Sequence, residues 1–234
     1  MSKFFDIENP IIVFLNRLAD IIILNILFII CSIPIVTIGA STTALYYVTT
    51  KMVKKEESYI WKDFFKSFKE NFGQATIIWL INIAVIAVFV IDTLINRSNP
   101  DMIPQPLIVV IVVLMLVAYS VMMYVYPLLS HYENTVGATI KNAFLLSLVH
   151  LPQTILFDVL GVLPIVIFFT QYWIQLFPIV LAVGFAGPAY LASLEWVKIF
   201  KKLDPKEDVS SDEEGSVDVT NLGESYEQQQ QEEN

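Results

Sequence analysis

Four polar side chains stand inside long apolar stretches of this sequence, and they are its most evident candidates for chemistry: Asp158, Glu195, Asn25 and Asn82. Asp158 lies between "ILF" and "VLG", where its surroundings are almost pure hydrocarbon. An ionised carboxylate near the centre of a bilayer costs roughly 2.5 to 3.5 kcal/mol on insertion scales. We therefore expect Asp158 to face the interior of a helix bundle or a water-filled crevice, as part of a solute path or in a structural salt bridge or cap.

The other three residues have simpler explanations. Glu195 precedes Lys198 by one helical turn, a spacing typical of an ordinary ion pair. Asn25 and Asn82 lie in the middle of apolar segments, where an amide can hydrogen-bond to a neighbouring helix. The four residues form the candidate intramembrane polar site.

Nothing in the sequence predicts an enzyme or a bound cofactor. It has no glycine-rich phosphate loop, no H-E-x-x-H and no G-x-S-x-G. His131 and His150 stand at the two edges of one loop, without further residues that would complete a metal site, so no metal is expected. Nor does any feature indicate nucleic-acid binding.

Composition indicates a membrane protein. Hydrophobic residues make up 56% of the 234 residues and charged residues 16%, a balance too apolar for an ordinary soluble domain. A membrane-spanning helix needs about 20 apolar residues, and four regions approach that length: 75–95, 106–130, 153–171 and 176–197. The predicted fold class is all-α, a polytopic helix bundle with the lipid bilayer as its surroundings.

The first apolar region has two interpretations. Residues 21–33 are followed by "SIPIVTIGAS", in which Pro34 and Gly39 favour a kink or a turn, and then by a helical stretch rich in small residues that would let helices approach closely. The start is therefore one span or a hairpin, which gives five or six membrane segments.

Lysine distribution predicts the orientation. Six lysines lie between residues 51 and 69, Lys141 follows the apolar region 106–130, and three lysines end the region 176–197, whereas the intervening loops hold only Arg97 as a basic residue. Because basic residues mark the cytoplasmic side, we expect a multi-pass protein of the bacterial cell membrane with a cytoplasmic C-terminus. A hairpin start, which we favour, makes the N-terminus cytoplasmic as well and gives six segments.

The segment "YIWKDFFKSFKENF" has helical amphipathicity. Its aromatic residues recur every three or four positions, and its lysines and acids, Asp63 among them, occupy the opposite face. This pattern is typical of a helix lying in the cytoplasmic membrane interface. It serves as a topology anchor or as a docking surface, whose candidate residues are Trp61, Lys62, Phe65, Lys66 and Lys69.

A second cytoplasmic candidate is the loop "HYENTVGATIKNAFLLSLVHLP", with Glu133, Gly137 and Lys141. It resembles in outline the coupling segment by which ABC importer permeases dock on their ATPase, although its spacings differ from that pattern. The alternative is an amphipathic connector that packs on the bundle through four apolar residues, Ile140, Phe144, Leu145 and Leu148.

The end of the chain differs from the rest. Residues 203–234 hold eleven acids and one lysine, whereas the residues before them hold twelve acids and thirteen bases. This segment has few large apolar side chains, so their burial could not offset the conformational entropy that the segment would lose on folding. We divide the chain into a membrane domain, 1–202, and a disordered acidic tail, 203–234.

The pieces "NRLAD", "PIVTIGASTTALYY" and "FFKSFKENFGQA", with "YENTVGATIKNAFLLSLVHLP", resemble the YesL-like membrane proteins of Firmicutes, a family of unknown function. The resemblance covers most of residues 9–200. It implies a companion of carbohydrate ABC importers or sensor kinases, with no established activity.

Two functions follow as hypotheses. The first is a non-enzymatic accessory or regulatory partner of a carbohydrate ABC importer or a sensor kinase. The second is a transporter or ABC-permease-like subunit that moves a small solute such as a sugar. A sugar path needs several inward polar groups, and the apolar segments offer few, so the first hypothesis is favoured.

Overall fold

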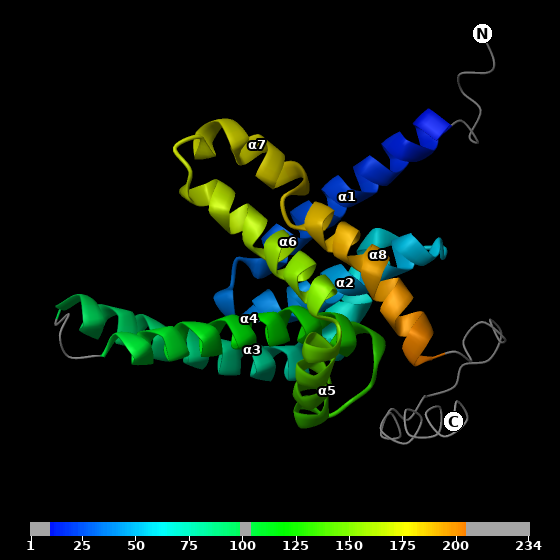
Figure 1. The fold of residues 1–234 in the computed structure, drawn as a ribbon. Helices are drawn as coiled ribbons and strands as arrows, with labels where there is room; N and C mark the ends of the chain where they lie inside the picture. The colour runs from blue at the N-terminus through cyan, green and yellow to red at the C-terminus, as the bar shows by residue number, and fades with distance from the viewer. Residues whose placement is uncertain (1–9, 99–103, 205–234) are drawn as a thin grey trace, which may run out of the picture.

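The computed structural model describes residues 10–98 and 104–204, and all regular structure within these ranges is helical (Figure 1). The helices are α1 Pro10–Ser32, the 3₁₀ turn η2 Ile35–Thr37, α2 Ile38–Lys54, α3 Ile60–Ser98, α4 Gln105–His131, α5 Val136–Val149, α6 Leu151–Phe169, α7 Trp173–Val183 and α8 Ala186–Leu203. The prediction of an all-α fold is confirmed.

In the described part of the chain, four helices are long and apolar enough to cross a membrane. They contain the spans Ile12–Ser32, Ile60–Arg97, Pro106–His131 and Leu151–Phe169, and a bent pair, α7 with α8, makes five if it counts as one span. The protein is therefore a multi-pass helical membrane protein. The sixth segment of the favoured arrangement would be α2, but its 17 residues fall short of the length that a regular span needs.

Helix α2 lies at the centre of the bundle, in contact with α1, α3, α4 and α8. It runs antiparallel to α3: the indole nitrogen of Trp79 donates to the carbonyl of Ile35 at 2.6 Å, and at the other end Lys51 pairs with Asp63 at 3.3 Å. A Cβ on Gly39 would lie only 2.4 Å from the carbonyl oxygen of Ala75. The small residues of α2 thus permit close helix approach, as the sequence predicts.

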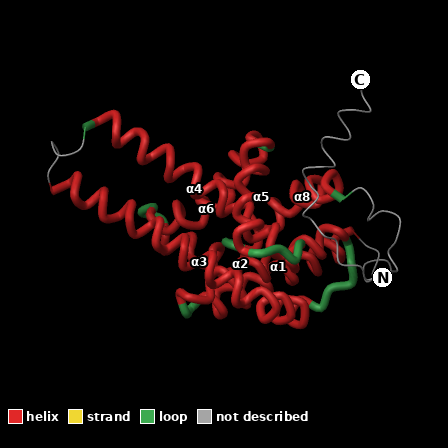
Figure 2. The backbone as a smooth tube through the Cα atoms, turned by 90° about the horizontal axis from the view of Figure 1, so that it is seen from below, coloured by secondary structure: helices red, strands yellow, loops and turns green. Residues whose placement is uncertain are grey.

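Helix α3 is continuous over 39 residues, which corresponds to about 58 Å at the α-helical rise. It joins what the sequence analysis treats as two parts, the amphipathic segment and the span over 75–95. Because the hydrocarbon core of a bilayer is only about 30 Å thick, part of α3 must extend beyond it. With α4 it forms a long hairpin that projects from the other helices (Figures 1 and 2).

The predicted span over 176–197 is in fact broken. Helix α7 ends at Val183 and α8 begins at Ala186, with a bend of 50° between the two axes. The apolar run continues through the break, but Gly184, Gly187 and Pro188 lie beside it and favour an interruption of the helix.

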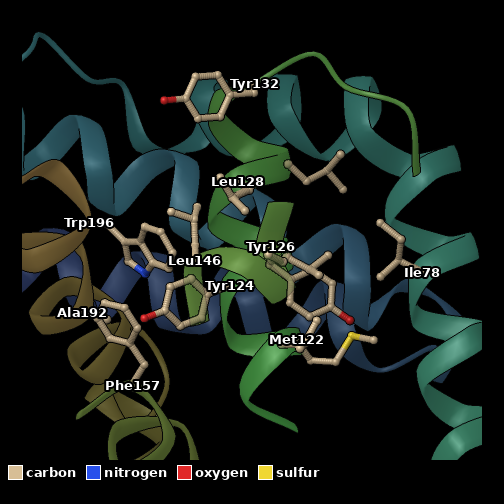
Figure 3. Close-up of a cluster of buried hydrophobic side chains, with 14 of the residues drawn as sticks. Ile78, Met122, Tyr124, Tyr126, Leu128, Tyr132, Leu146, Phe157, Ala192 and Trp196 are labelled. Carbon is tan, nitrogen blue, oxygen red and sulfur yellow. The ribbon is translucent and has the colours of Figure 1, made fainter. Parts of the chain in front are cut away.

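The buried core is largely aromatic near the ends of α4 and α8. Trp196 stacks on Phe157 with ring centroids 5.0 Å apart, and Tyr124 meets the indole edge-on at 4.8 Å. Figure 3 shows these three side chains gathered between α4, α6 and α8. The hydroxyl of Tyr124 also bonds with that of Thr154 at 2.8 Å, so the cluster connects three helices through both packing and a hydrogen bond.

Several helix ends meet at one end of the bundle. The His131 ring at the end of α4 stacks on Phe200 of α8 at 4.1 Å, and the Tyr132 hydroxyl donates to the Asp204 carboxylate at 2.5 Å. The ends of α4 and α8 are thus neighbours. Leu203, the first residue of the predicted tail, is the last residue of α8, and the tail from 205 to 234 lies outside the described residues.

Candidate functional site

Asn25 holds the break between α7 and α8 together. Its amide nitrogen donates to the carbonyls of Val180 at 3.1 Å and Leu181 at 2.7 Å, and its amide oxygen accepts from the backbone N–H groups of Phe185 at 2.8 Å and Ala186 at 2.9 Å. The side chain is completely buried. A broken helix inside a membrane frees backbone groups that water cannot reach. This one amide bonds to four backbone groups beside the break, of which the Val180 carbonyl also accepts from the Gly184 N–H at 2.9 Å.

The prediction that Asn25 links helices is therefore confirmed. The link is more specific than a contact between two side chains, because Asn25 serves as the C-cap of one helix and the N-cap of the next.

Asp158 lies on α6 against α4, where one carboxylate oxygen accepts a hydrogen bond from the Ser120 hydroxyl at 2.6 Å. The other oxygen is buried and has no hydrogen-bond partner among the described residues. The carboxylate is thus directed between two helices, as the sequence analysis expects. It has no cationic partner there, so the predicted alternative of a salt bridge is wrong for the described residues.

Replacing Asp158 by asparagine should stabilise the protein by about 1 kcal/mol, because it removes a poorly compensated charge from apolar surroundings while keeping an acceptor for Ser120. The measurement is the apparent melting temperature in detergent. Asp92→Asn, near the outer end of α3, is the control and should change stability by less than about 0.5 kcal/mol. Equal shifts for the two variants would show that the charge of Asp158 is no more destabilising in its surroundings than that of Asp92.

Glu195 forms the predicted pair with Lys198, at 2.6 Å, with both side chains partly open to the surroundings. It lies on α8, apart from the interior polar groups. Glu195 therefore belongs to the helix surface and not to a shared polar site.

Asn82 contributes to a cavity of about 430 Å³ between the helices. The cavity wall is mostly apolar and comes from α1, α2, α3, α4, α6 and α8. Its polar members are one threonine, one asparagine and three tyrosines: Thr42, Asn82, Tyr46, Tyr119 and Tyr126. The four predicted polar residues thus occupy four separate places: the helix break, the α4–α6 contact, the cavity wall and the surface of α8.

The amphipathic start of α3 is held by protein contacts. Phe64 is completely buried in a cluster with Leu24 and Met52, and Asp63 pairs with Lys51 of α2. The expectation that Asp63 shares the exposed face with the lysines is wrong. Its position beside Phe64 on the helix places it against α2, where Lys51 compensates its charge.

The opposite side of this segment is exposed. Trp61 is 64% exposed, with its ring 4.8 Å from that of Phe65, and the three lysines Lys62, Lys66 and Lys69 are all exposed. We call Trp61, Lys62, Lys66 and Lys69 the basic face of α3. It is the larger part of the predicted docking surface, whereas Phe65 is half-buried between this face and the core.

The loop after α4 becomes a short helix, α5, with Glu133, Gly137 and Lys141 all exposed at its start. Thr135 caps it by accepting from the Ala138 N–H at 3.4 Å. The face that packs on the bundle is made of small and polar residues with one leucine: Thr139, Ala143, Leu146 and Ser147.

The expected packing face of α5 is therefore wrong for three of its four members. Ile140 packs against the core, but Phe144, Leu145 and Leu148 are 41%, 48% and 48% exposed. Apolar residues alone cannot distinguish a core-facing side from a lipid-facing or partner-facing one in a membrane protein.

Sequence reasoning missed several polar contacts between helices. They include the Ser120 partner of Asp158, the bond between the hydroxyls of Thr49 and Ser193 at 2.8 Å, and the Tyr124–Thr154 bond described above. Their only signal is a small hydroxyl in an apolar stretch, which is common in membrane helices. Within the described ranges, no group of three His, Cys, Asp or Glu side chains is placed to hold a metal ion.

Comparison with known proteins yields one match. Residues 21–93 match the model of a family described as protein of unknown function, DUF624. This part, less than half of the chain, runs from α1 through most of α3 and includes Asn25, Gly39 and the basic face. No curated protein and no solved structure matches the chain significantly.

Proposed function

We propose that this protein is a non-enzymatic accessory or regulatory membrane protein that acts through contact with a subunit of a carbohydrate ABC importer or with a sensor kinase. The partner class follows from the resemblance to YesL-like proteins, which is part of the proposal. The observation that carries it is the basic face of α3. Packing of Phe64 and the Lys51–Asp63 pair hold this helix in place, so its exposed lysines are not needed to position it.

The arrangement of helix ends supports a cytoplasmic position for this face. The Lys51–Asp63 pair joins the end of α2 to the start of α3, and the His131–Phe200 stack joins the ends of α4 and α8. These are the lysine-rich ends of the sequence. Because basic residues mark the cytoplasmic side of a membrane protein, we propose that these ends lie in the cytoplasm. We propose the same location for the C-terminus and, with α1 and α2 forming a hairpin, for the N-terminus.

The exposed apolar residues of α5 support the same function. Phe144, Leu145 and Leu148 lie on the helix that follows the end of α4, and their side chains are about half exposed. Exposed apolar patches of this kind mark surfaces that contact lipid or another protein. A partner that contacts both α5 and the basic face would use apolar and charged contacts together.

A transporter is the second candidate, and the broken helix α7–α8 favours it. Transporters often place substrates at the freed backbone groups of such breaks. In this protein, however, Asn25 already bonds to the Leu181 carbonyl and to the Phe185 and Ala186 N–H groups at the break. The cavity beside the break is lined mainly by apolar side chains, which suits a sugar poorly because its hydroxyls would lose their hydrogen bonds. We therefore favour the accessory function.

Reversing the charge of Lys62, Lys66 and Lys69 to glutamate should lower co-purification of the partner at least tenfold. Each of these side chains is exposed, so the folded bundle should tolerate the change. The measurement is quantitative mass spectrometry of importer subunits and sensor kinases that co-purify from native membranes with the wild-type protein and with the variant.

The matched control reverses Lys198, Lys201 and Lys202 at the end of α8, which changes net charge equally at another place. It should leave partner recovery within about twofold of wild type. Labelling of a cysteine introduced at Ser58, in a background without Cys31, checks that the topology is unchanged. Full partner recovery in the α3 variant, or equal losses in both variants, would contradict the proposal.

A further inference from the structure

The cavity between the helices has a size and a lining that fit an apolar chain. Its volume of about 430 Å³ lies in the range of roughly 300 to 1,000 Å³ that is common for ligand pockets. Helix α4 contributes a stripe of residues from Met115 to Tyr126, a length of about 16 Å at the helical rise. The cavity is therefore elongated along α4.

The cavity opens toward the lipid-facing surface. Val85 and Ile86 of α3 and Ile165 of α6 line it, and their side chains are 40%, 40% and 51% exposed. All three belong to candidate membrane spans. The surroundings at the opening are therefore lipid, and the molecules with direct access to it are those of the bilayer.

One group in the wall lacks a partner. Tyr126 is 4% exposed, and its hydroxyl is buried without a hydrogen bond to any described residue. Leaving a buried hydroxyl unsatisfied costs about 1 to 3 kcal/mol. In Figure 3 Tyr126 leaves α4 on the side opposite to Tyr124, whose hydroxyl is paired with Thr154. The Tyr126 hydroxyl thus lacks an acceptor among residues 10–98 and 104–204.

We propose that this cavity binds one acyl chain of a membrane lipid, with the carbonyl oxygen of the chain accepting a hydrogen bond from the Tyr126 hydroxyl. The chain then extends along α4 toward Met115, among apolar side chains. Tyr126 lies near the end of α4 that adjoins α8, and Met115 lies about three turns further into the span. The bound lipid would therefore have its carbonyl near the end of α4 that adjoins α8, and its acyl chain would extend further into the membrane span. The lipid site is independent of the proposed protein partner.

The test uses the full chain in nanodiscs of phosphatidylethanolamine and phosphatidylglycerol that contain a phosphatidylglycerol with a photoactivatable diazirine in one acyl chain. After illumination, mass spectrometry locates the adducts. We expect them on cavity residues such as Met115 and Met123, in addition to lipid-facing residues such as Leu114.

Two pairs of variants make the test specific. Ala118→Phe fills the cavity and should lower adducts on its lining at least fivefold, whereas Ala84→Phe, on the lipid-facing side of α3, should not. Tyr126→Phe keeps the shape and should lower the cavity adducts about fivefold, as loss of one hydrogen bond predicts. Its control, Tyr172→Phe, removes an exposed hydroxyl and should have no effect.

A diazirine-labelled alkane, which has no carbonyl, separates the contribution of the apolar cavity wall from that of the Tyr126 hydrogen bond. Its cavity adducts should fall in Ala118→Phe but not in Tyr126→Phe. Cavity labelling that neither Ala118→Phe nor Tyr126→Phe reduces would overturn the proposal. So would equal reduction of phospholipid and alkane adducts in Tyr126→Phe, because the hydroxyl would then not recognise the carbonyl.

Discussion

Replacing Asn25 by alanine is expected to destabilise the protein by about 3 kcal/mol or more. The change removes the Asn25 bonds to the Leu181 carbonyl and to two N–H groups at the start of α8, and each unsatisfied buried group costs about 1 to 3 kcal/mol; the Val180 carbonyl keeps its bond from the Gly184 N–H. The measurement is unfolding in mixed detergent micelles, followed by circular dichroism. The purified variant should also lose the fixed bend between α7 and α8, seen as faster proteolysis near Gly184.

The matched control is Asn82→Ala, which removes an amide from the cavity wall and should cost less than about 1 kcal/mol. Asn25→Asp gives a further check. It keeps an acceptor for Phe185 and Ala186 but places negative charge against the carbonyls of α7, so its loss should approach that of alanine. Equal stabilities of Asn25→Ala and Asn82→Ala would contradict the role of Asn25 as a double cap.

Replacing Gly39 by alanine should be the second most damaging small change. The new Cβ would lie 2.4 Å from the backbone oxygen of Ala75 and 2.9 Å from the Cβ of Trp79. Neither atom belongs to the flexible end of a side chain, so α2 and α3 must move apart. We expect a loss of about 3 kcal/mol, the upper part of the usual range for overpacking, measured by the same unfolding assay.

Gly73→Ala provides the control on the partner helix. No atom lies within 4 Å of the position its Cβ would take, so this variant should gain up to about 1 kcal/mol from the better helix propensity of alanine. Because Gly39→Ala receives the same propensity gain, the difference between the two variants measures the clash alone. Similar stabilities would mean that α2 and α3 are not in close contact.

The basic face, the helix break and the cavity differ in how far the sequence could predict them. The lysines of the basic face are visible in the sequence, and the helical period of the aromatic residues predicts that the two groups take opposite sides. Asp63 breaks this rule because a partly buried ion pair with Lys51 stabilises it on the packed side. The spacing of residues predicts which side of a helix they occupy. It does not predict that a residue on another helix, here Lys51, will pair with one of them.

Two properties follow from the order of amino acids alone: the chain is helical, and it crosses a membrane several times. A run of about 20 apolar residues must satisfy its backbone internally once it is in lipid, so its helical state does not depend on its neighbours. The approximate extents of α4 and α6 follow from the same rule. The small residues of α2 likewise predict close packing, because only they permit it.

Only the contacts between helices show what stabilises the break in the last apolar run, which faces are buried and which residues line the cavity. Gly184, Gly187 and Pro188 mark the place of the break, but the four bonds of Asn25 join it to residues 155 to 161 positions away, so no local pattern reveals this partner. The buried face of α5 could not be predicted from the sequence either, because apolar side chains in a membrane protein are stable in contact with lipid as well as in contact with the core. In water the hydrophobic effect would have distinguished the two faces, but in a bilayer the distinction comes from close packing and hydrogen bonds between helices.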